Sequence, residues 1–381
     1  MDDASVVLDE PVGRNKTYSR DEVKRALAPY AKPDARHGVG HFLLDYALYT
    51  ALIAGVLFLQ PLWAKVLCSI LAGLKMANLG TMGHEAGHGN LAQSRRLNDV
   101  MGALCFMPCL YNYRLWNFDH HQMHHIQTNV NHQDSWVPLS KAQFDALPAW
   151  RRGLHRLYRS SWGLGIAPYY LIERWMPVRF IPWKNLPKEH RAAAWGHLVF
   201  LTTYAVAFIA FLAAAPLYSP TDSVTAVLLG FVLPFYVWIH MFSFTVYVQH
   251  THSKLPWFDG PVHKKAMLPQ EALSTSVIFP HWLEHLMHNV YHHAVHHVNP
   301  RVPFHRLSEA THKLNEMAPE TSIVQPFSFR WMHENLKACR LYDYENHRWL
   351  DFDGRPTTEP ATTPEQRKAI AHYGPGVIAG V

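Results

Sequence analysis

The sequence predicts an all-α integral membrane protein with four transmembrane helices, arranged as two hairpins, and a helical cytoplasmic cap. Four apolar stretches occur in two closely spaced pairs, and each has about the 20 residues that a bilayer-spanning helix requires. Lysine and arginine lie almost entirely outside these stretches. The chain also holds 28 histidines, many of them clustered just beyond the apolar pairs.

Residues 1–40 are expected to form a polar N-terminal arm that contains a short helix. Ser19 can cap this helix, and Glu22, three residues later, would complete a capping box. The polar and basic composition of the arm argues against a cleavable signal peptide.

The membrane domain is expected at residues 41–315, with spans at 41–59, 62–82, 198–216 and 224–248. Each pair of spans is joined by a minimal turn, which favours membrane hairpins over the alternative of buried helices in a soluble protein. Asp45, Lys65, Lys75 and His240 interrupt the spans. The two lysines lie toward opposite ends of the second span, where long side chains can snorkel to the interface.

The distribution of positive charge predicts the orientation. Residues 1–40 contain seven lysines and arginines, 83–197 contain thirteen and 248–381 contain thirteen, whereas the two turns contain none. Cytoplasmic segments of membrane proteins carry this excess. Both termini and all the histidine clusters are therefore expected on the cytoplasmic side, at the inner membrane of a bacterium or the endoplasmic reticulum of a eukaryote.

Two further segments lie outside the spans. Residues 150–195 alternate aromatic and basic side chains, which is typical of an interfacial helix or of a soluble helix with a basic face. Residues 316–381 are expected to form a cytoplasmic C-terminal tail, loosely ordered after Asp351 because proline, threonine and glycine are frequent there.

Composition excludes several classes of function. The net charge is +6 and the sequence pI is about 9.0, but the basic residues form no single stripe or RNA-binding motif, so no nucleic-acid partner is expected. The four cysteines are too few for a disulfide framework or an iron–sulfur cluster.

Three histidine clusters share one design: His84-Glu-Ala-Gly-His88, His121-Gln-Met-His124-His125 and His293-Ala-Val-His296-His297. Residues three or four apart lie on one face of a helix, so each cluster directs its imidazoles to one point. Eight neutral nitrogen ligands exceed what one tetrahedral zinc ion needs, but they suit two transition-metal ions.

The first cluster also matches the HExxH signature of zinc metalloproteases, in which Glu85 would be the general base. An intramembrane protease is therefore an alternative, with Asp259 as its third ligand. It leaves the other two clusters unexplained. Two irons would account for all three clusters. Such a centre can use dioxygen to take hydrogen from an unactivated C–H bond, which no side chain does alone.

The chain resembles the integral-membrane fatty acid desaturases, a family with three histidine boxes and a non-haem di-iron centre. The resemblance covers residues 40–315 and is closest to the omega-type oleate desaturases. Besides the three clusters, it rests on Tyr247-Val-Gln-His-Thr-His252, on Trp136-Val-Pro138 and on Pro300, Pro303 and His305 around the third box. The sequence departs from the family at Gly89, where many plant members have a histidine.

The resemblance implies two iron ions bound by the box histidines. These are His84 and His88 from the first box, His121, His124 and His125 from the second, and His293, His296 and His297 from the third. His250 is the expected ninth ligand, with His288 and His252 as second choices. His120 and His292 flank boxes two and three and leave their register open by one residue. The residues expected to hold ligand histidines in place are His120, His292, His305, Glu85, Asp119 and Asp134.

The implied reaction is oxygen-dependent desaturation of a fatty acyl chain of a lipid, in unsaturated fatty acid biosynthesis. A hydroxylase, an acetylenase or a carotenoid oxygenase on the same scaffold is the alternative. No haem-binding segment is present, so electrons are expected from a separate donor of the ferredoxin or cytochrome b5 type. The remaining histidines, among them His155, His347 and His372, are expected at the surface.

Overall fold

The computed structural model describes residues 18–131, 135–182, 186–264, 266–374 and 376. Within these residues, four helices are long and apolar enough to cross a membrane, and each overlaps one predicted span. They are α2 (Ala35–Phe58), α3 (Leu62–Gly87), α9 (Lys188–Ala213) and the continuous helix Ser223–His250. The last consists of α10 (Ser223–Val227), a π-helical turn (Leu228–Val232) and α11 (Leu233–His250).

The spans differ from their predicted bounds where polar residues continue a helix beyond its apolar part. The α2 helix begins six residues earlier than predicted because the Asp34 carboxylate caps it, accepting from the Arg36 N–H at 2.9 Å. Helix α3 continues to Gly87 at its C-terminal end, and so it carries His84 beyond the apolar stretch.

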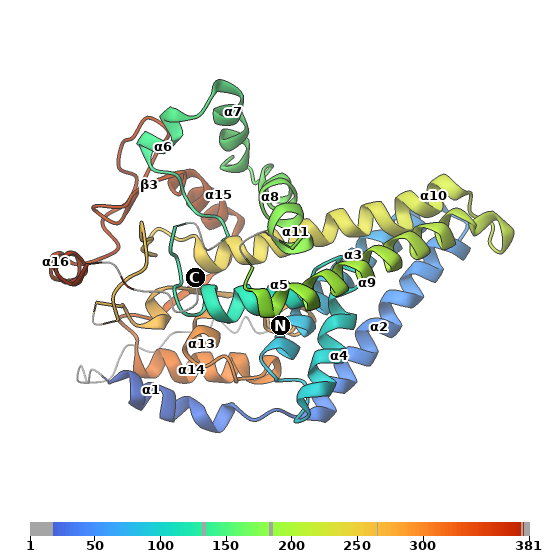
Figure 1. Cartoon of the computed structure of the whole chain (residues 1–381), viewed down its shortest axis with the longest axis horizontal. Coiled ribbons are helices and arrows are strands. Elements are labelled where there is room, and N and C mark those ends of the chain that lie inside the picture. Colours follow the sequence, from blue (N-terminus) through green and yellow to red (C-terminus); the bar gives the residue numbers. More distant parts are fainter. Residues whose placement is uncertain (1–17, 132–134, 183–185, 265, 375, 377–381) are drawn as a thin grey trace, which may run out of the picture.

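The long helices lie side by side and extend together away from the rest of the molecule (Figure 1). The α3 helix packs against both α2 and α11. Its approach to α11 requires a glycine, because a Cβ atom at Gly73 would lie 2.5 Å from Val237 Cβ and 2.7 Å from the Pro234 carbonyl oxygen. Small residues allow this close contact between membrane helices.

The outer faces of the long helices expose large apolar side chains, as expected for surfaces in contact with lipid. Examples from three of them are Leu43, Trp63, Leu67, Val199, Val206 and Phe211.

Three charged side chains within the spans, Asp45, Lys65 and Lys75, have polar partners. Asp45 is 1% exposed, and its carboxylate contacts Lys75 Nζ at 2.9 Å and His288 Nε2 at 2.5 Å. Lys65 is also buried and donates to the Thr221 hydroxyl, which donates to the Leu57 carbonyl at 2.6 Å. Each of the two lysines therefore has a polar partner within the protein.

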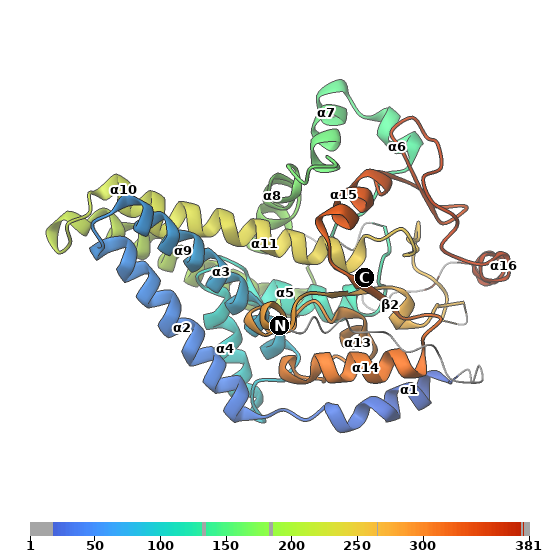
Figure 2. The ribbon, with the colours of Figure 1, turned by 180° about the vertical axis from the view of Figure 1, so that it is seen from behind.

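The rest of the described chain forms a cap at one end of the long helices (Figure 1). Its α-helices are α1 (Arg20–Leu27), α4 (Arg95–Phe106), α5 (Tyr113–Asp119), α6 (Lys141–Ala146), α7 (Ala149–Tyr158), α8 (Ile166–Tyr169), α12 (His281–Leu286), α13 (His293–Val298), α14 (Leu307–Met317), α15 (Phe329–Ala338) and α16 (Pro364–Tyr373). Two π-helical segments, His120–His124 and Tyr170–Phe180, follow α5 and α8. The predicted capping box of Ser19 and Glu22 is confirmed at α1. Figure 2 shows α1 lying along α14, with which it is in contact.

Two small sheets add β structure to the helical fold. Strands β1 (Thr275–Ile278) and β2 (Ile323–Pro326) pair in parallel, with Thr275 opposite Ile323. Strands β3 (Leu341–Asp343) and β4 (Arg348–Leu350) pair antiparallel.

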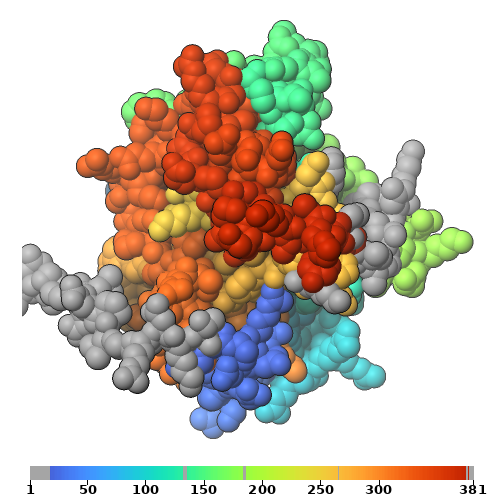
Figure 3. Space-filling model, turned by 90° about the vertical axis from the view of Figure 1, so that its left-hand side faces the viewer, coloured from blue at the N-terminus to red at the C-terminus, as the bar shows by residue number. Residues whose placement is uncertain are grey.

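The C-terminal residues fold onto the outer face of the cap, where they form the red surface in Figure 3. Trp349 is fully buried, and its indole N–H donates to the His252 carbonyl at 2.9 Å. Beyond Asp351, the described residues lead into α16, a helix that the sequence did not predict. His347, expected at the surface, is 5% exposed and contacts the Thr362 hydroxyl at 2.9 Å.

Candidate metal centre

The described part of the chain brings histidines into two groups whose ring nitrogens lie within 4.8 Å of one another. The first group is His84, His88, His120 and His296, and the second is His124, His250, His293 and His297. His125 borders the first group, with its Nε2 atom 3.0 Å from His120 Nε2 and 3.2 Å from His296 Nε2. Eight of the nine histidines that the sequence predicted as ligands therefore converge, together with His120.

The second box supplies His120 in place of His121 because its helix changes from α to π at this point. In a π-helix the backbone bonds join residues five apart, and here the His125 N–H donates to the His120 carbonyl at 3.1 Å. His120 and His125 consequently share one face and His124 another. An α-helical periodicity, which the sequence analysis assumed, would have grouped His121 with His124 and His125.

The third box divides its histidines in the same way. His293 and His297 lie four residues apart on one face of α13 and join the second group, whereas His296 joins the first. The first box, at the end of α3, contributes only to the first group, and His250, the last residue of α11, only to the second. Each group thus draws on three separate elements.

The spacing of the ring nitrogens fits ligands of a common ion. His293 Nε2 lies 3.0 Å from both His250 Nε2 and His297 Nε2, and His88 Nε2 lies 3.0 Å from His120 Nε2. Two nitrogens that bind one metal ion at right angles, each about 2.1 Å from it, are about 3 Å apart. Without a cation, several unprotonated nitrogens at this distance would repel one another, so the arrangement suits a metal ion in each group.

The environment keeps these imidazoles in the neutral form that binds metals. Burial, reinforced by the neighbouring imidazoles, holds the pKa of His88, His120, His293, His296 and His297 well below the usual range. Burial lowers the pKa of an imidazole because the charged form is poorly solvated inside the protein. The nitrogens are therefore free to bind a cation at neutral pH.

In the first group, other side chains fix the orientation of the rings. Glu85 is buried, and its Oε1 atom lies 3.2 Å from His84 Nδ1. Its Oε2 atom accepts from Asn90 Nδ2 at 3.1 Å and from the Phe304 N–H at 2.9 Å. With both oxygens engaged, Glu85 holds His84 so that Nε2 faces the group.

His121 has a similar supporting contact with His88. Its Nδ1 atom lies 2.8 Å from the Asn117 carbonyl and must donate to it, so its Nε2 atom can accept from His88 Nδ1 at 3.1 Å. That bond leaves His88 Nε2 unprotonated and directed at the group. His121 itself lies outside the first group and orients His88, which is a member of it.

In the second group, Asn129 and Thr128 orient the rings. Thr128 also belongs to the family resemblance around the second box, but neither residue was predicted to contact a ligand. The Asn129 side-chain oxygen lies 3.1 Å from His250 Nδ1, while its Nδ2 donates to the Pro256 and Leu273 carbonyls at 3.1 and 2.9 Å. The Thr128 hydroxyl donates to the His124 carbonyl at 2.9 Å and lies 3.3 Å from His297 Nδ1. Both residues follow the second box directly in the sequence, and this position could have identified them as supporting residues.

Other candidates lie outside the two groups. His288 pairs with Asp45, His252 Nε2 lies 3.4 Å from Gln325 Oε1, and His292 Nε2 lies 3.3 Å from Glu284 Oε1. Asp119, expected beside a ligand, instead forms an ion pair with Arg179. Asp259, the third ligand of the protease alternative, accepts from Asn131 at 2.9 Å, and the His305 ring stacks on His37. Asp134 falls outside the described residues.

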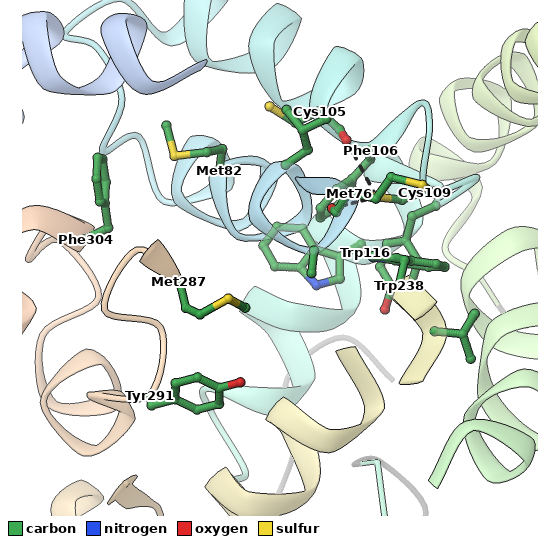
Figure 4. Close-up of a cluster of buried hydrophobic side chains, with 14 of the residues drawn as sticks. Met76, Met82, Cys105, Phe106, Cys109, Trp116, Trp238, Met287, Tyr291 and Phe304 are labelled. Carbon is green, nitrogen blue, oxygen red and sulfur yellow. Dashed lines mark hydrogen bonds between the residues drawn. The ribbon is translucent and has the colours of Figure 1, made fainter. Parts of the chain in front are cut away.

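A cavity of about 90 Å³ reaches both groups, because His84, His120, His124, His250, His293 and His296 contribute to its wall. The remaining wall is largely apolar and aromatic, including Ala77, Gly80, Tyr111, Trp116, Tyr170, Phe242 and Met287. Figure 4 shows two of these side chains, Trp116 and Met287, in the surrounding core. A small apolar space bordered by the two histidine groups suits a reaction on a hydrocarbon segment.

The chain is similar in sequence to several known proteins. The spinach chloroplast omega-6 fatty acid desaturase is 27% identical over 316 residues, which are 81% of this chain and 65% of that protein. The sn-1 oleoyl-lipid 12-desaturase of Picosynechococcus is 24% identical over 81% of this chain and 82% of its own length. The sn-1 acyl-lipid omega-3 desaturase (ferredoxin) of Synechocystis is 27% identical over 82% and 85%. The family model for fatty acid desaturases matches residues 61–329, and the chain belongs to this family.

Proposed function

We propose that the protein is an oxygen-dependent desaturase of lipid acyl chains. One CH₂–CH₂ unit becomes CH=CH, and dioxygen with two electrons and two protons becomes two molecules of water. The observation that carries this proposal is the pair of buried histidine groups that border one apolar cavity.

Two iron ions are proposed as the cofactor. His84, His88, His120, His125 and His296 would hold one ion, and His124, His250, His293 and His297 the other. Imidazole suits iron, and the iron pair would supply the oxidation of an unactivated C–H bond by dioxygen. The chain itself contributes rigid placement of the ligands through Glu85, His121, Thr128 and Asn129, and a cavity wall that keeps water from the hydrocarbon.

The names of the relatives support a lipid-linked acyl substrate and a separate electron donor. Two of them act on acyl or oleoyl lipids and one uses ferredoxin, as their names state. We infer the same substrate class here and a donor of the ferredoxin or cytochrome b5 type. No contact or cavity described above favours the alternatives on the same scaffold, which are hydroxylase, acetylenase and carotenoid oxygenase activity.

The environment of Glu85 argues against the intramembrane protease. A zinc protease needs this carboxylate free to take a proton from water, but both Glu85 oxygens are engaged by His84, Asn90 and Phe304. A single zinc site would also leave the second histidine group without a role.

The proposed topology is two membrane hairpins with the cap and both termini in the cytoplasm. It rests on the charge distribution, since 33 of the 35 lysines and arginines lie in the three segments 1–40, 83–197 and 248–381, which this topology puts on one side. With the native cysteines replaced, a cysteine at Glu320 in the cap should resist an impermeant thiol reagent in intact cells, and one at Ser219 should react. Labelling at Glu320 from outside would reverse the topology.

The register of the second box gives a test of the metal assignment. We expect His120→Ala to lower iron from two ions per chain toward one, because it removes a nitrogen 3.0 Å from His88 Nε2. His121→Ala should keep more iron, since His121 only orients His88; loss of such a supporting contact weakens metal binding about 10- to 100-fold. Iron analysis of both variants, purified from iron-replete cells, is the measurement. Greater iron loss in His121→Ala would contradict the π-helical register.

A further inference from the structure

Another cavity opens on the surface of the protein beside the first histidine group. Its volume is about 650 Å³, and we call it the basic hollow. The C-terminal end of α3 and the starts of α4, α5 and α9 contribute to its wall, and these elements meet where the long helices join the cap (Figure 1). Gln93, Gln122 and His190 in this wall are exposed, so the hollow is open to solvent.

The basic hollow reaches the first histidine group through His88. Of the nine histidines proposed as iron ligands, His88 alone lines the hollow. His121, whose Nε2 atom lies 3.1 Å from His88 Nδ1, belongs to the same wall. Gly89 keeps this part of the wall open, because a Cβ atom there would have no heavy atom of a non-neighbouring residue within 4 Å. The hollow is therefore a direct route from the surface to a proposed ligand.

The apolar cavity reaches the histidines by a different route. Trp116 belongs to the wall of that cavity and packs against Gly87, which lines the hollow, so closely that a Cβ atom at Gly87 would overlap its ring. The Trp116 ring also stacks on His120, with the ring centroids 4.4 Å apart. Trp116 therefore forms part of a partition between the two spaces. A hydrocarbon and a polar partner can approach the histidines through separate openings.

The charge of the basic hollow indicates which partner fits it. Its negative charge comes from Asp99, which lies 3.8 Å from Arg114. Arg95 and Arg301 also line the hollow and are exposed, and neither has an ion-pair partner within the described part of the chain. Arg96, directly after Arg95, is exposed as well. Unpaired positive charges around an opening attract an acidic partner and guide its approach.

We propose that the basic hollow is the docking site of an acidic one-electron carrier protein that reduces the iron pair. This inference rests on the proposed desaturase function, which consumes two electrons for each double bond. Two reduced carriers dock in turn, and each leaves oxidised after it has given one electron by way of His88. Ferredoxin is the carrier named for one relative, and an acidic ferredoxin is therefore the probe in the tests.

The first test measures binding and does not require turnover. Ferredoxin in its oxidised form is titrated onto the purified full chain in nanodiscs at low ionic strength. The double variant Arg95→Glu, Arg301→Glu should bind at least about tenfold more weakly than wild type, because two attractive charges become repulsive. About 0.5 M salt should weaken binding of the wild type most, since it screens exposed charges.

The matched control is the double variant Arg330→Glu, Lys337→Glu. It makes the same change in net charge at two exposed positions of α15, which lies on the other side of the cap from α4 (Figures 1 and 2). This variant should bind ferredoxin as wild type does. Equal dissociation constants for the two double variants would overturn the inference.

The second test locates the carrier on the surface. A photo-crosslinking amino acid in place of Gln93, in the wall of the hollow, should form a covalent product with ferredoxin. The same amino acid in place of Glu334, on the exposed face of α15, should form none. Crosslinking from position 334 without crosslinking from position 93 would place the carrier elsewhere and overturn the inference.

Turnover separates this inference from the proposed function. With saturating acyl lipid, Arg95→Glu, Arg301→Glu should raise the KM for ferredoxin more than it lowers kcat, because the change weakens docking. A lower kcat with an unchanged KM would overturn the inference. Wild-type protein that crosslinks to ferredoxin from position 93 but desaturates no acyl chain would support the docking site and refute the proposed function.

Discussion

His296→Ala is expected to abolish acyl-chain oxidation and to lower iron binding while the protein remains in the membrane. The His296 ring is 1% exposed, and its centroid lies 4.5 Å from that of His84 and 4.7 Å from that of His88. Its Nε2 atom is 3.2 Å from His125 Nε2, so the substitution removes a nitrogen from the middle of the first group. Loss of a supporting contact lowers metal affinity or activity about 10- to 100-fold. Loss of a ligand should have a larger effect, so we expect turnover to fall by more than about 100-fold.

The measurement is turnover together with iron content, in membranes that contain equal amounts of protein. His372→Ala provides the control, because His372 lies on the exposed helix α16, away from both histidine groups. A His296→Ala protein that keeps two irons and most of its turnover would show that the first group is not a metal site.

Asp45→Asn is expected to lower the stability of the folded protein strongly. The Asp45 carboxylate is buried between Lys75 and His288, at 2.9 and 2.5 Å. Removing one member of a buried ion pair leaves an uncompensated charge and costs about 3–5 kcal/mol. Since His288 precedes the ligand candidate His293 by five residues, we also expect weaker iron retention.

Thermal unfolding in detergent measures this effect, and Asp34→Asn is a matched control. Asp34 also contacts a histidine, with His37 Nδ1 at 2.9 Å, but the pair is exposed and asparagine still caps a helix. Equal melting temperatures for the two variants would mean that the Asp45 pair does not stabilise the fold.

The sequence predicts the long helices and the convergence of the histidines well, because both depend on local patterns. Apolar length locates the spans, and residues four apart, such as His84 and His88 or His293 and His297, reach the same group whatever the tertiary structure. The polar extensions of α2 and α3 were missed because hydropathy reports the end of an apolar stretch and not the end of a helix.

Other features depend on contacts that no local pattern contains. The choice of His120 over His121 follows from a π-helical turn, which changes the residues that share a face. Asn129 supports His250 across 121 residues, and Thr128 contacts His297 across 169. Asp119 pairs with Arg179, 60 residues away, and so does not support a ligand. His347, which was expected at the surface, is buried and contacts the Thr362 hydroxyl across 15 residues.

We propose that this chain desaturates acyl chains at a histidine-bound iron pair. The most direct test of this proposal is the total fatty acid profile, by mass spectrometry, of a bacterial host that expresses the full chain with a ferredoxin reductant. We expect new fatty acids two mass units lighter than their precursors in cells with the wild-type protein, and none in cells with His296→Ala. An unchanged profile from wild-type protein that carries two irons and receives electrons would contradict the account, as would products heavier by one oxygen atom.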